Sequence, residues 1–284
     1  MNRTIVGFAI LPASLSAAAL GSDGSVMGTA DGQRGEDLAA DVDALLASLG
    51  KRVPGIARGK FRAAIGWGGP SVLAVVETNG AGGKARDAAV RSTLEAEAGR
   101  SLDGWRIAWA SPSGAEGSIL AGAAPEEEIL AIHRAVESAG GEAVGADLLP
   151  LVLVDAVQAE DKKREASLLA VLLPGSVSLF LIDGKGTVAS CRHRFLNGGD
   201  TEDRAETEVM RGLVAWEGAE GAAPKRLDLI DAGGLAGRLA EKVTVPVREV
   251  SLEEIVQRVI RGRKAKDAPS DPSRLALIAA RLNL

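Results

Sequence analysis

Several residue types that carry chemistry or stacking are scarce in this chain of 284 residues. It has no tyrosine, only 3% aromatic residues, one cysteine and two histidines. One cysteine cannot form an internal disulfide bond, and two histidines cannot build a histidine-rich metal centre. We therefore expect a reducing cytoplasmic setting, with Cys191 and His133 in ordinary packing roles.

Basic residues are also too few for binding to a phosphate backbone. The chain has 33 Lys and Arg residues but 38 Asp and Glu residues, which gives a net charge of -5. This excludes nucleic acid as a ligand. No apolar stretch approaches the roughly 20 residues that span a bilayer. The hydrophobic fraction of 46% is ordinary for a globular protein. At roughly 150 residues per domain, the length predicts about two domains.

The first twenty residues imitate a secretory signal, with one early positive charge and an apolar stretch. Pro12 and Ser14 interrupt that stretch. The same segment also recurs inside the chain, because residues 10–16 (ILPASLS) align with residues 172–178 (LLPGSVS) at a constant offset of 162. A cleaved leader would have no reason to copy an interior segment, so we interpret the opening as structural.

Each copy of this repeat predicts three strands followed by a helix. The tight turns fall at Asp23-Gly24 and Asp183-Gly184, and the helices at about 36–49 and 201–216. The second copy continues with a strand, a short helix and an edge strand, at about 226–230, 235–242 and 245–247. Three antiparallel strands followed by helix, strand, helix and strand form the RNase H-like half of an actin-type fold. The predicted fold class is therefore α/β, with duplicated βββαβα lobes.

The material between the two halves predicts an inserted α+β subdomain at about 62–122. Its elements are strands near 62–66 and 71–77, a helix at about 84–99, and strands near 105–110 and 118–121. A helix follows Pro125 and stops at Gly140-Gly141. We expect a first lobe over 1–160, a second lobe over 161–262, and a linker with a C-terminal helix over 263–284.

The order of several short motifs resembles the PilM family of type IV pilus assembly proteins. The cytoplasmic domain of type II secretion GspL and the cell-division protein FtsA are related further off, and the likeness covers most of the chain. The motifs are AIGWGGPSV at 64–72, EAE at 95–97 ahead of LDGW at 102–105, the segment 128–151, RFLNGGD at 194–200 and DAGGLA at 231–236.

The resemblance implies a cytoplasmic actin-like adaptor, peripheral to the inner membrane. It would bind the N-terminal cytoplasmic segment of a bitopic partner of the PilN type, and self-association stays open. In that family ATP can lie between the two halves, with Mg²⁺. An actin-like ATPase holds metal and phosphate through an aspartate in each hairpin turn. Here the turns read ILPAS at 10–14 and LLPGS at 172–176, and neither contains an aspartate.

Catalytic residues are therefore not predicted, and neither is a metal site. If nucleotide binds at all, the residues left to bind it are the turn hydroxyls of Ser14 and Ser176 and the glycine turn Gly233-Gly234. The carboxylates Asp147, Asp155 and Asp231 stand near strand ends or turns, but no spacing pairs any two of them.

Two further functional hypotheses stay open beside the non-catalytic adaptor. The first is a nucleotide-dependent actin-like ATPase or a sugar-kinase relative. The second is the soluble part of a longer membrane protein of the GspL type. Four tryptophans are the only large indole surfaces, and we expect Trp67 to contribute to partner binding if it is exposed in a groove.

Overall fold

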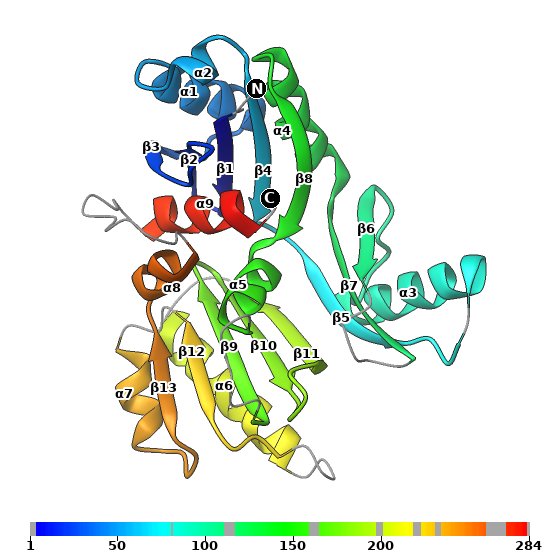
Figure 1. The fold of residues 1–284 in the computed structure, drawn as a ribbon. Helices are drawn as coiled ribbons and strands as arrows, with labels where there is room; N and C mark the ends of the chain where they lie inside the picture. Colours follow the sequence, from blue (N-terminus) through cyan, green and yellow to red (C-terminus); the bar gives the residue numbers. More distant parts are fainter. Residues whose placement is uncertain are drawn as a thin grey trace. The chain divides into compact units, whose positions relative to one another are not determined.

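A computed structural model describes residues 4–80, 82–110, 117–158, 165–196, 201–217, 223–230, 234–259 and 271–282. The chain packs as two compact units (Figure 1). The first unit comprises Met1–Gly69, Glu126–Ala159 and Leu252–Leu284, and the second comprises Pro70–Pro125 and Glu160–Ser251. Among the described residues, no helix is both long enough and apolar enough to cross a membrane.

The first unit is built on a five-stranded sheet in the order β3-β2-β1-β4-β8. β1 pairs antiparallel with β2 and parallel with β4. β1 and β2 are buried along almost their whole length, as expected of strands covered on both faces. The bounds are β1 Thr4–Ile10, β2 Ser14–Leu20, β3 Val26–Gln33, β4 Phe61–Trp67 and β8 Glu142–Leu148.

The second unit contains a five-stranded sheet of matching topology, in the order β11-β10-β9-β12-β13. β9 pairs antiparallel with β10 and parallel with β12. The bounds are β9 Ser167–Leu173, β10 Ser176–Ile182, β11 Val188–Phe195, β12 Leu227–Ile230 and β13 Val247–Val250.

The internal repeat is confirmed by the register of these strands. β2 and β10 start and end at positions 162 apart, and so do β3 and β11. The pairing shifts between Ala19 and Leu20 in the first copy and between Leu181 and Ile182 in the second, again 162 apart. Since a bulge is a specific local distortion, its recurrence at the same place supports a duplicated unit.

The strand expected at about 62–66 lies elsewhere than predicted. We placed it at the start of the inserted segment, but β4 is the fourth strand of the first sheet, parallel to β1. Its parallel pairing to β1 matches that of β12 to β9, so each half contributes a parallel strand after its helix. Such a pairing joins residues some 57 positions apart, for example Thr4 and Phe61, and periodicity alone cannot reveal it.

Helices cover the two sheets as the amphipathic patterns require. α1 and α4 pack with the first sheet, and α6 and α7 pack on the second around Leu179, Val209 and Leu229. Asp37 caps α1 by accepting a hydrogen bond from the backbone N–H of Ala40 at 3.1 Å. The bounds are α1 Leu38–Gly50, α2 Pro54–Ala57, α4 Glu126–Ser138, α6 Thr201–Glu217 and α7 Leu235–Ala240.

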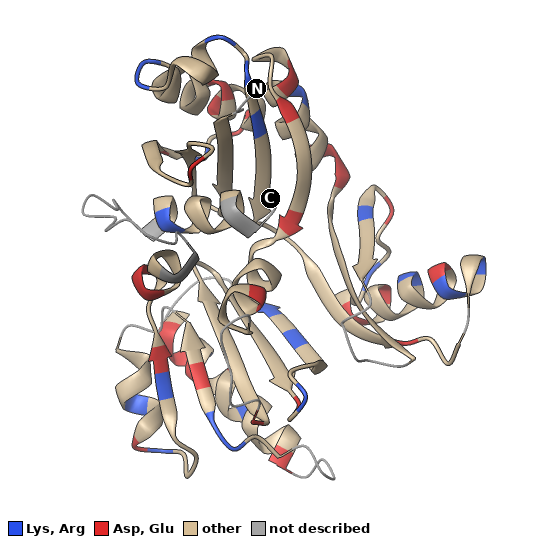
Figure 2. Ribbon diagram, viewed as in Figure 1, with Lys and Arg blue, Asp and Glu red and all other residues tan. Residues whose placement is uncertain are grey.

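The inserted segment forms a three-stranded antiparallel sheet in the order β5-β7-β6. Helix α3 covers one face through Val90 and Leu94, against which the half-buried Trp105 and Trp109 also pack. Both acidic and basic side chains lie along α3 (Figure 2). The bounds are β5 Val72–Glu77, α3 Gly83–Ala98, β6 Trp105–Ala110 and β7 Ser118–Pro125. This segment packs with the second half, whereas we assigned it to the first lobe.

The C-terminal helix α9, Asp271–Leu282, lies against the first sheet. It contacts β1, β2 and β4 on one side and α5 and α8 on another, so that every side chain from Leu275 to Ala280 is buried. The sheet face below it carries small residues in register: Gly7, Ala9, Ser16, Ala18, Ala64 and Gly66. A Cβ atom built on Gly7 would lie 2.0 Å from the carbonyl oxygen of Ala276. The residues at 271–282 therefore belong to the first unit rather than to a separate tail.

Two further helices complete the first unit. β8 ends at Leu148 and α5, Leu149–Gln158, follows at once. α8, Leu252–Val259, follows β13 and packs against α9. α5 is an almost uniformly apolar helix, and such a run cannot be told from a buried strand by periodicity.

Candidate functional site

The hairpin turns that would face a nucleotide are closed by their own backbone. In the first turn the Leu11 N–H donates to the Ser14 carbonyl at 2.8 Å, and the Gly68 N–H donates to the Ile10 carbonyl at 2.7 Å. Leu11 is buried, whereas Pro12 and Ala13 are exposed. Proline offers no N–H to a phosphate, so this loop is a poor anion cradle.

The second turn is equally tight. Gly175 lies at φ +79°, and its carbonyl accepts a hydrogen bond from the Leu196 N–H at 2.8 Å. Ser176 is 2% exposed and, as the first residue of β10, pairs with Leu173 of β9 and Phe195 of β11, so its hydroxyl is less available than a surface turn position would suggest. Gly234 is exposed at the start of α7, and Gly233 lies outside the described residues.

The structure brings together two carboxylates that the sequence could not pair. Asp147 is the last residue but one of β8, and Asp155 lies two turns along α5. Burial, reinforced by the charge of Asp147, raises the pKa of Asp155. Asp231, the third carboxylate considered, lies outside the described residues. Among the described residues, no cluster of three or more His, Cys, Asp or Glu side chains could hold a metal ion.

Trp67 is in the core, not in an exposed groove as its predicted partner-binding role requires. Its side chain is 1% exposed at the end of β4, beside Ile10 and Leu148 in register. The Arg34 guanidinium lies 5.2 Å from the ring centroid and forms an ion pair with Glu128. Burial lowers the pKa of Arg34, although nearby Asp41 opposes the effect. A partner cannot reach the indole while this packing holds.

A polar cross-strand pair occurs at the same place in both repeats. Ser16 donates to Asp31 at 2.6 Å in the first copy, and Ser178 is hydrogen bonded to His193 Nδ1 at 2.7 Å in the second. Asp31 and His193 each bond a further segment, because Ser273 of α9 donates to Asp31 at 2.7 Å and Ser71 is hydrogen bonded to His193 Nε2 at 3.3 Å. The repeat thus reuses one position to attach α9 in the first unit and the inserted segment in the second.

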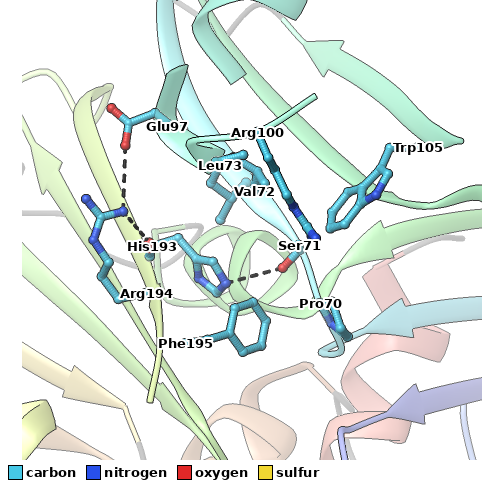
Figure 3. A pocket seen from close by; sticks show the side chains of 11 residues that line it. Pro70, Ser71, Val72, Leu73, Glu97, Arg100, Trp105, His193, Arg194 and Phe195 are labelled. Atoms are coloured by element: carbon cyan, nitrogen blue, oxygen red, sulfur yellow. Dashed lines mark hydrogen bonds and ion pairs between the residues drawn. The ribbon is translucent and has the colours of Figure 1, made fainter. Parts of the chain in front are cut away.

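A pocket in the second unit adjoins this second cluster (Figure 3). It has a volume of about 270 Å³ and is lined by the start of β5, the end of α3 with the residues that follow it, the start of β6, and the end of β11. Its polar side chains are Ser71, Glu97, Arg100, His193 and Arg194. Arg194 pairs with Glu97 at 3.7 Å and donates to the His193 carbonyl at 2.9 Å. The ring of Phe195 meets His193 edge to face, with centroids 5.0 Å apart.

The Ser71, His193 and Ser178 arrangement is poorly suited to catalysis. A serine nucleophile needs a base whose pKa lies near the working pH and a third group that stabilises the imidazolium. Burial, with a smaller effect of Arg194, lowers the pKa of His193 to about 4. Ser178 is uncharged, so it cannot stabilise a protonated ring. The geometry favours a neutral imidazole that links two strands, with one ring nitrogen donating and the other accepting.

This link predicts a specific loss of stability in acid. A histidine titrates near 6.5 when unfolded and near 4 in this fold, so the unfolded chain takes up a proton that the folded chain does not. The stability is full above pH 6.5 and falls by about 3 kcal/mol as the pH drops to about 4. Urea melts of the wild type and of His193→Gln between pH 7 and 4 measure it. The wild type should lose more stability than the variant, and parallel curves would contradict the buried neutral ring.

Sequence reasoning set Cys191 aside as a nucleophile, and its surroundings agree. Burial, together with the charge of Glu97, raises the pKa of the thiol to about 12. It therefore stays protonated and unreactive at neutral pH.

Comparison with known proteins gives the fold its name. No family model and no curated protein sequence matches the chain. A PilM-PilN type IV pilus biogenesis complex matches with a TM-score of 0.68 at 17% identity, over 99% of this chain and 97% of that one. A Bacteroides thetaiotaomicron protein with an actin-like ATPase fold and unknown function matches with a TM-score of 0.60 at 7% identity, over 92% and 96%. This chain has the actin-like ATPase fold.

A third solved structure with the actin-like fold comes from a secretion system. The cytoplasmic domain of EpsL, an inner membrane component of the Vibrio cholerae type II secretion system, matches with a TM-score of 0.54 at 10% identity, over 92% of this chain and 96% of that one. The PilM and GspL resemblances predicted from the motifs are thus confirmed at the level of the fold. One fold hosts many functions, so the site must carry any functional argument.

Proposed function

We propose that this protein is a non-catalytic actin-like adaptor that docks the cytoplasmic segment of a membrane partner in a type IV pilus or type II secretion machine. The observation that carries the proposal is the chemistry of the two hairpin turns. Each has proline where an actin-like ATPase needs a carboxylate, and several backbone groups of both turns are hydrogen bonded within the protein. The likeness to PilM in its complex with PilN supports a partner of the PilN type.

The adaptor would work on the cytoplasmic face of the inner membrane, held there through its partner. Losing the turn carboxylates removes phosphate chemistry but leaves the apolar strands of both sheets intact. An adaptor of this kind needs stable binding surfaces and no catalytic turnover.

Binding of the partner is tested with short synthetic peptides that match the cytoplasmic N-terminal segments of bitopic membrane proteins encoded beside this protein. Fluorescence anisotropy with the full chain at low salt should detect at least one of them at micromolar affinity. Failure of every segment to bind would contradict the proposal.

The alternative is a nucleotide-dependent actin-like protein, and the Asp147 and Asp155 pair favours it, since paired carboxylates are typical ligands of Mg²⁺. A ligand present at 100 times its Kd stabilises a fold by ~2.7 kcal/mol, which a thermal melt detects. We expect no shift of the melting temperature with millimolar Mg-ATP. A clear shift that Asp155→Asn abolishes would establish the alternative in place of the adaptor.

A further inference from the structure

The pocket of the second unit joins two strand edges. β5 is an edge strand of the inserted sheet, and β11 is an edge strand of the second sheet. These two edges lie against each other, and Ser71, just before β5, is hydrogen bonded to His193 of β11 at 3.3 Å. Both strands contribute their ends to the pocket wall, with Ser71 and Val72 from one side and His193 from the other.

The charges around this pocket are not balanced. Arg194 is neutralised by Glu97 at 3.7 Å, but Arg100 has no carboxylate within ion-pair distance among the described residues. Arg100 is instead held over Trp105, with its guanidinium carbon 4.9 Å from the ring centroid. Figure 3 shows the two side chains next to each other among the residues that line the pocket. The pocket therefore carries a net positive charge in a protein whose net charge is -5.

A guanidinium stacked on an indole is well prepared to bind a carboxylate. The aromatic face limits the rotation of the arginine, so little conformational entropy is lost when its N–H groups engage an anion. The planar fork of N–H donors matches a carboxylate with two parallel hydrogen bonds. Pro70, Val72 and Phe195 give the same pocket apolar walls, which suit the aliphatic part of an acidic side chain.

The size of the pocket limits what it can hold. Its volume of about 270 Å³ lies below the ~300–1,000 Å³ of typical small-molecule sites. It suits a side chain of a longer molecule better than a whole nucleotide or cofactor.

We propose that this pocket receives an Asp or Glu side chain of the partner segment, whose carboxylate pairs with Arg100. The inference rests on the proposed adaptor function and adds to it the place of docking and the chemistry of recognition.

The test is a double-mutant cycle on the bound peptide identified by fluorescence anisotropy. Arg100→Ala should weaken binding of that peptide at least 10-fold. The matched control is Arg106→Ala, an exposed arginine on β6 that does not line the pocket, and it should change the affinity less than 2-fold. Replacing the acidic residue of the peptide by Gln or Asn should weaken binding to the wild type 10-fold, but should not weaken binding to Arg100→Ala further.

The outcomes separate this inference from the adaptor function. If a segment binds the wild type but Arg100→Ala and Arg106→Ala behave alike, the docking place is wrong and the adaptor function stands. A bound segment without any Asp or Glu residue would overturn the inference in the same way. If no segment binds the wild type, the inference and the proposed function are both wrong.

Discussion

Replacing Trp67 by alanine is expected to lower the free energy of unfolding by about 3–5 kcal/mol. The indole is 1% exposed, lies in register between Ile10 and Leu148, and supports the Arg34 guanidinium. Truncation would leave a large cavity and remove the cation-π contact. Urea melts followed by circular dichroism measure the loss, and Trp67→Phe should cost clearly less because it keeps most of the apolar contact.

The same variant decides between the core and partner roles of Trp67. If the side chain is only structural, the folded fraction of Trp67→Ala binds the partner segment with wild-type affinity at low temperature. If the variant keeps wild-type stability but no longer binds the segment, Trp67 is not buried in the core and contacts the partner instead.

Substituting Gly7 by alanine should be nearly as damaging, although it adds a single methyl group. A Cβ atom at this position would lie 2.0 Å from the Ala276 carbonyl oxygen and 2.5 Å from the Ala280 nitrogen, so helix α9 must move. Overpacking against backbone costs about 3 kcal/mol. We expect a matching loss in chemical denaturation, together with faster proteolysis of α9.

Gly28→Ala is the matched control, because Gly28 lies in β3 of the same sheet and its added methyl group would meet only side chains at 3.5 Å or beyond. Since alanine is favoured over glycine inside a strand by ~0.5–1 kcal/mol, this variant should be as stable as the wild type or more so. Equal stability of the Gly7 and Gly28 variants would mean that α9 does not pack on β1.

The part of the fold that the sequence predicts best is the part that is local and repeated. The alignment of residues 10–16 with 172–178 predicts two equivalent hairpins. In the structure the strand registers of the two hairpins match, including the register shifts after Ala19 and Leu181. The helix predicted at 201–216 matches α6. Hairpins and amphipathic helices follow from short periodicities, so a single sequence is enough to find them.

The features that sequence reasoning missed depend on distant contacts. β4 joins the first sheet through a parallel pairing to β1, and α9 returns from the end of the chain to a face made of Gly7, Ala9 and Ala64. Glycine and alanine are weak strand formers, so the sequence alone does not show that these small residues form the sheet face on which a helix packs. The inserted segment likewise packs with the second half through Ser71 and His193, which are 122 residues apart.

The candidate pocket was missed for the same reason. Arg100 and Trp105 are close in sequence, but nothing in their spacing shows that a guanidinium stacks on the ring or that β11 closes the other side. One signal was available, because His193 occupies the repeat position of Asp31. A polar residue that stands at the same position of both copies, each time paired with a strand serine, indicates a shared attachment point within the duplication.

The most direct test of the adaptor account is calorimetric titration of the full chain with the partner segment, in the absence and in the presence of millimolar Mg-ATP. The account predicts one binding event per chain, with an affinity that Mg-ATP does not change, because the proposed adaptor needs no nucleotide in its hairpin turns. Binding that appears only with Mg-ATP, or no binding under either condition, would contradict it.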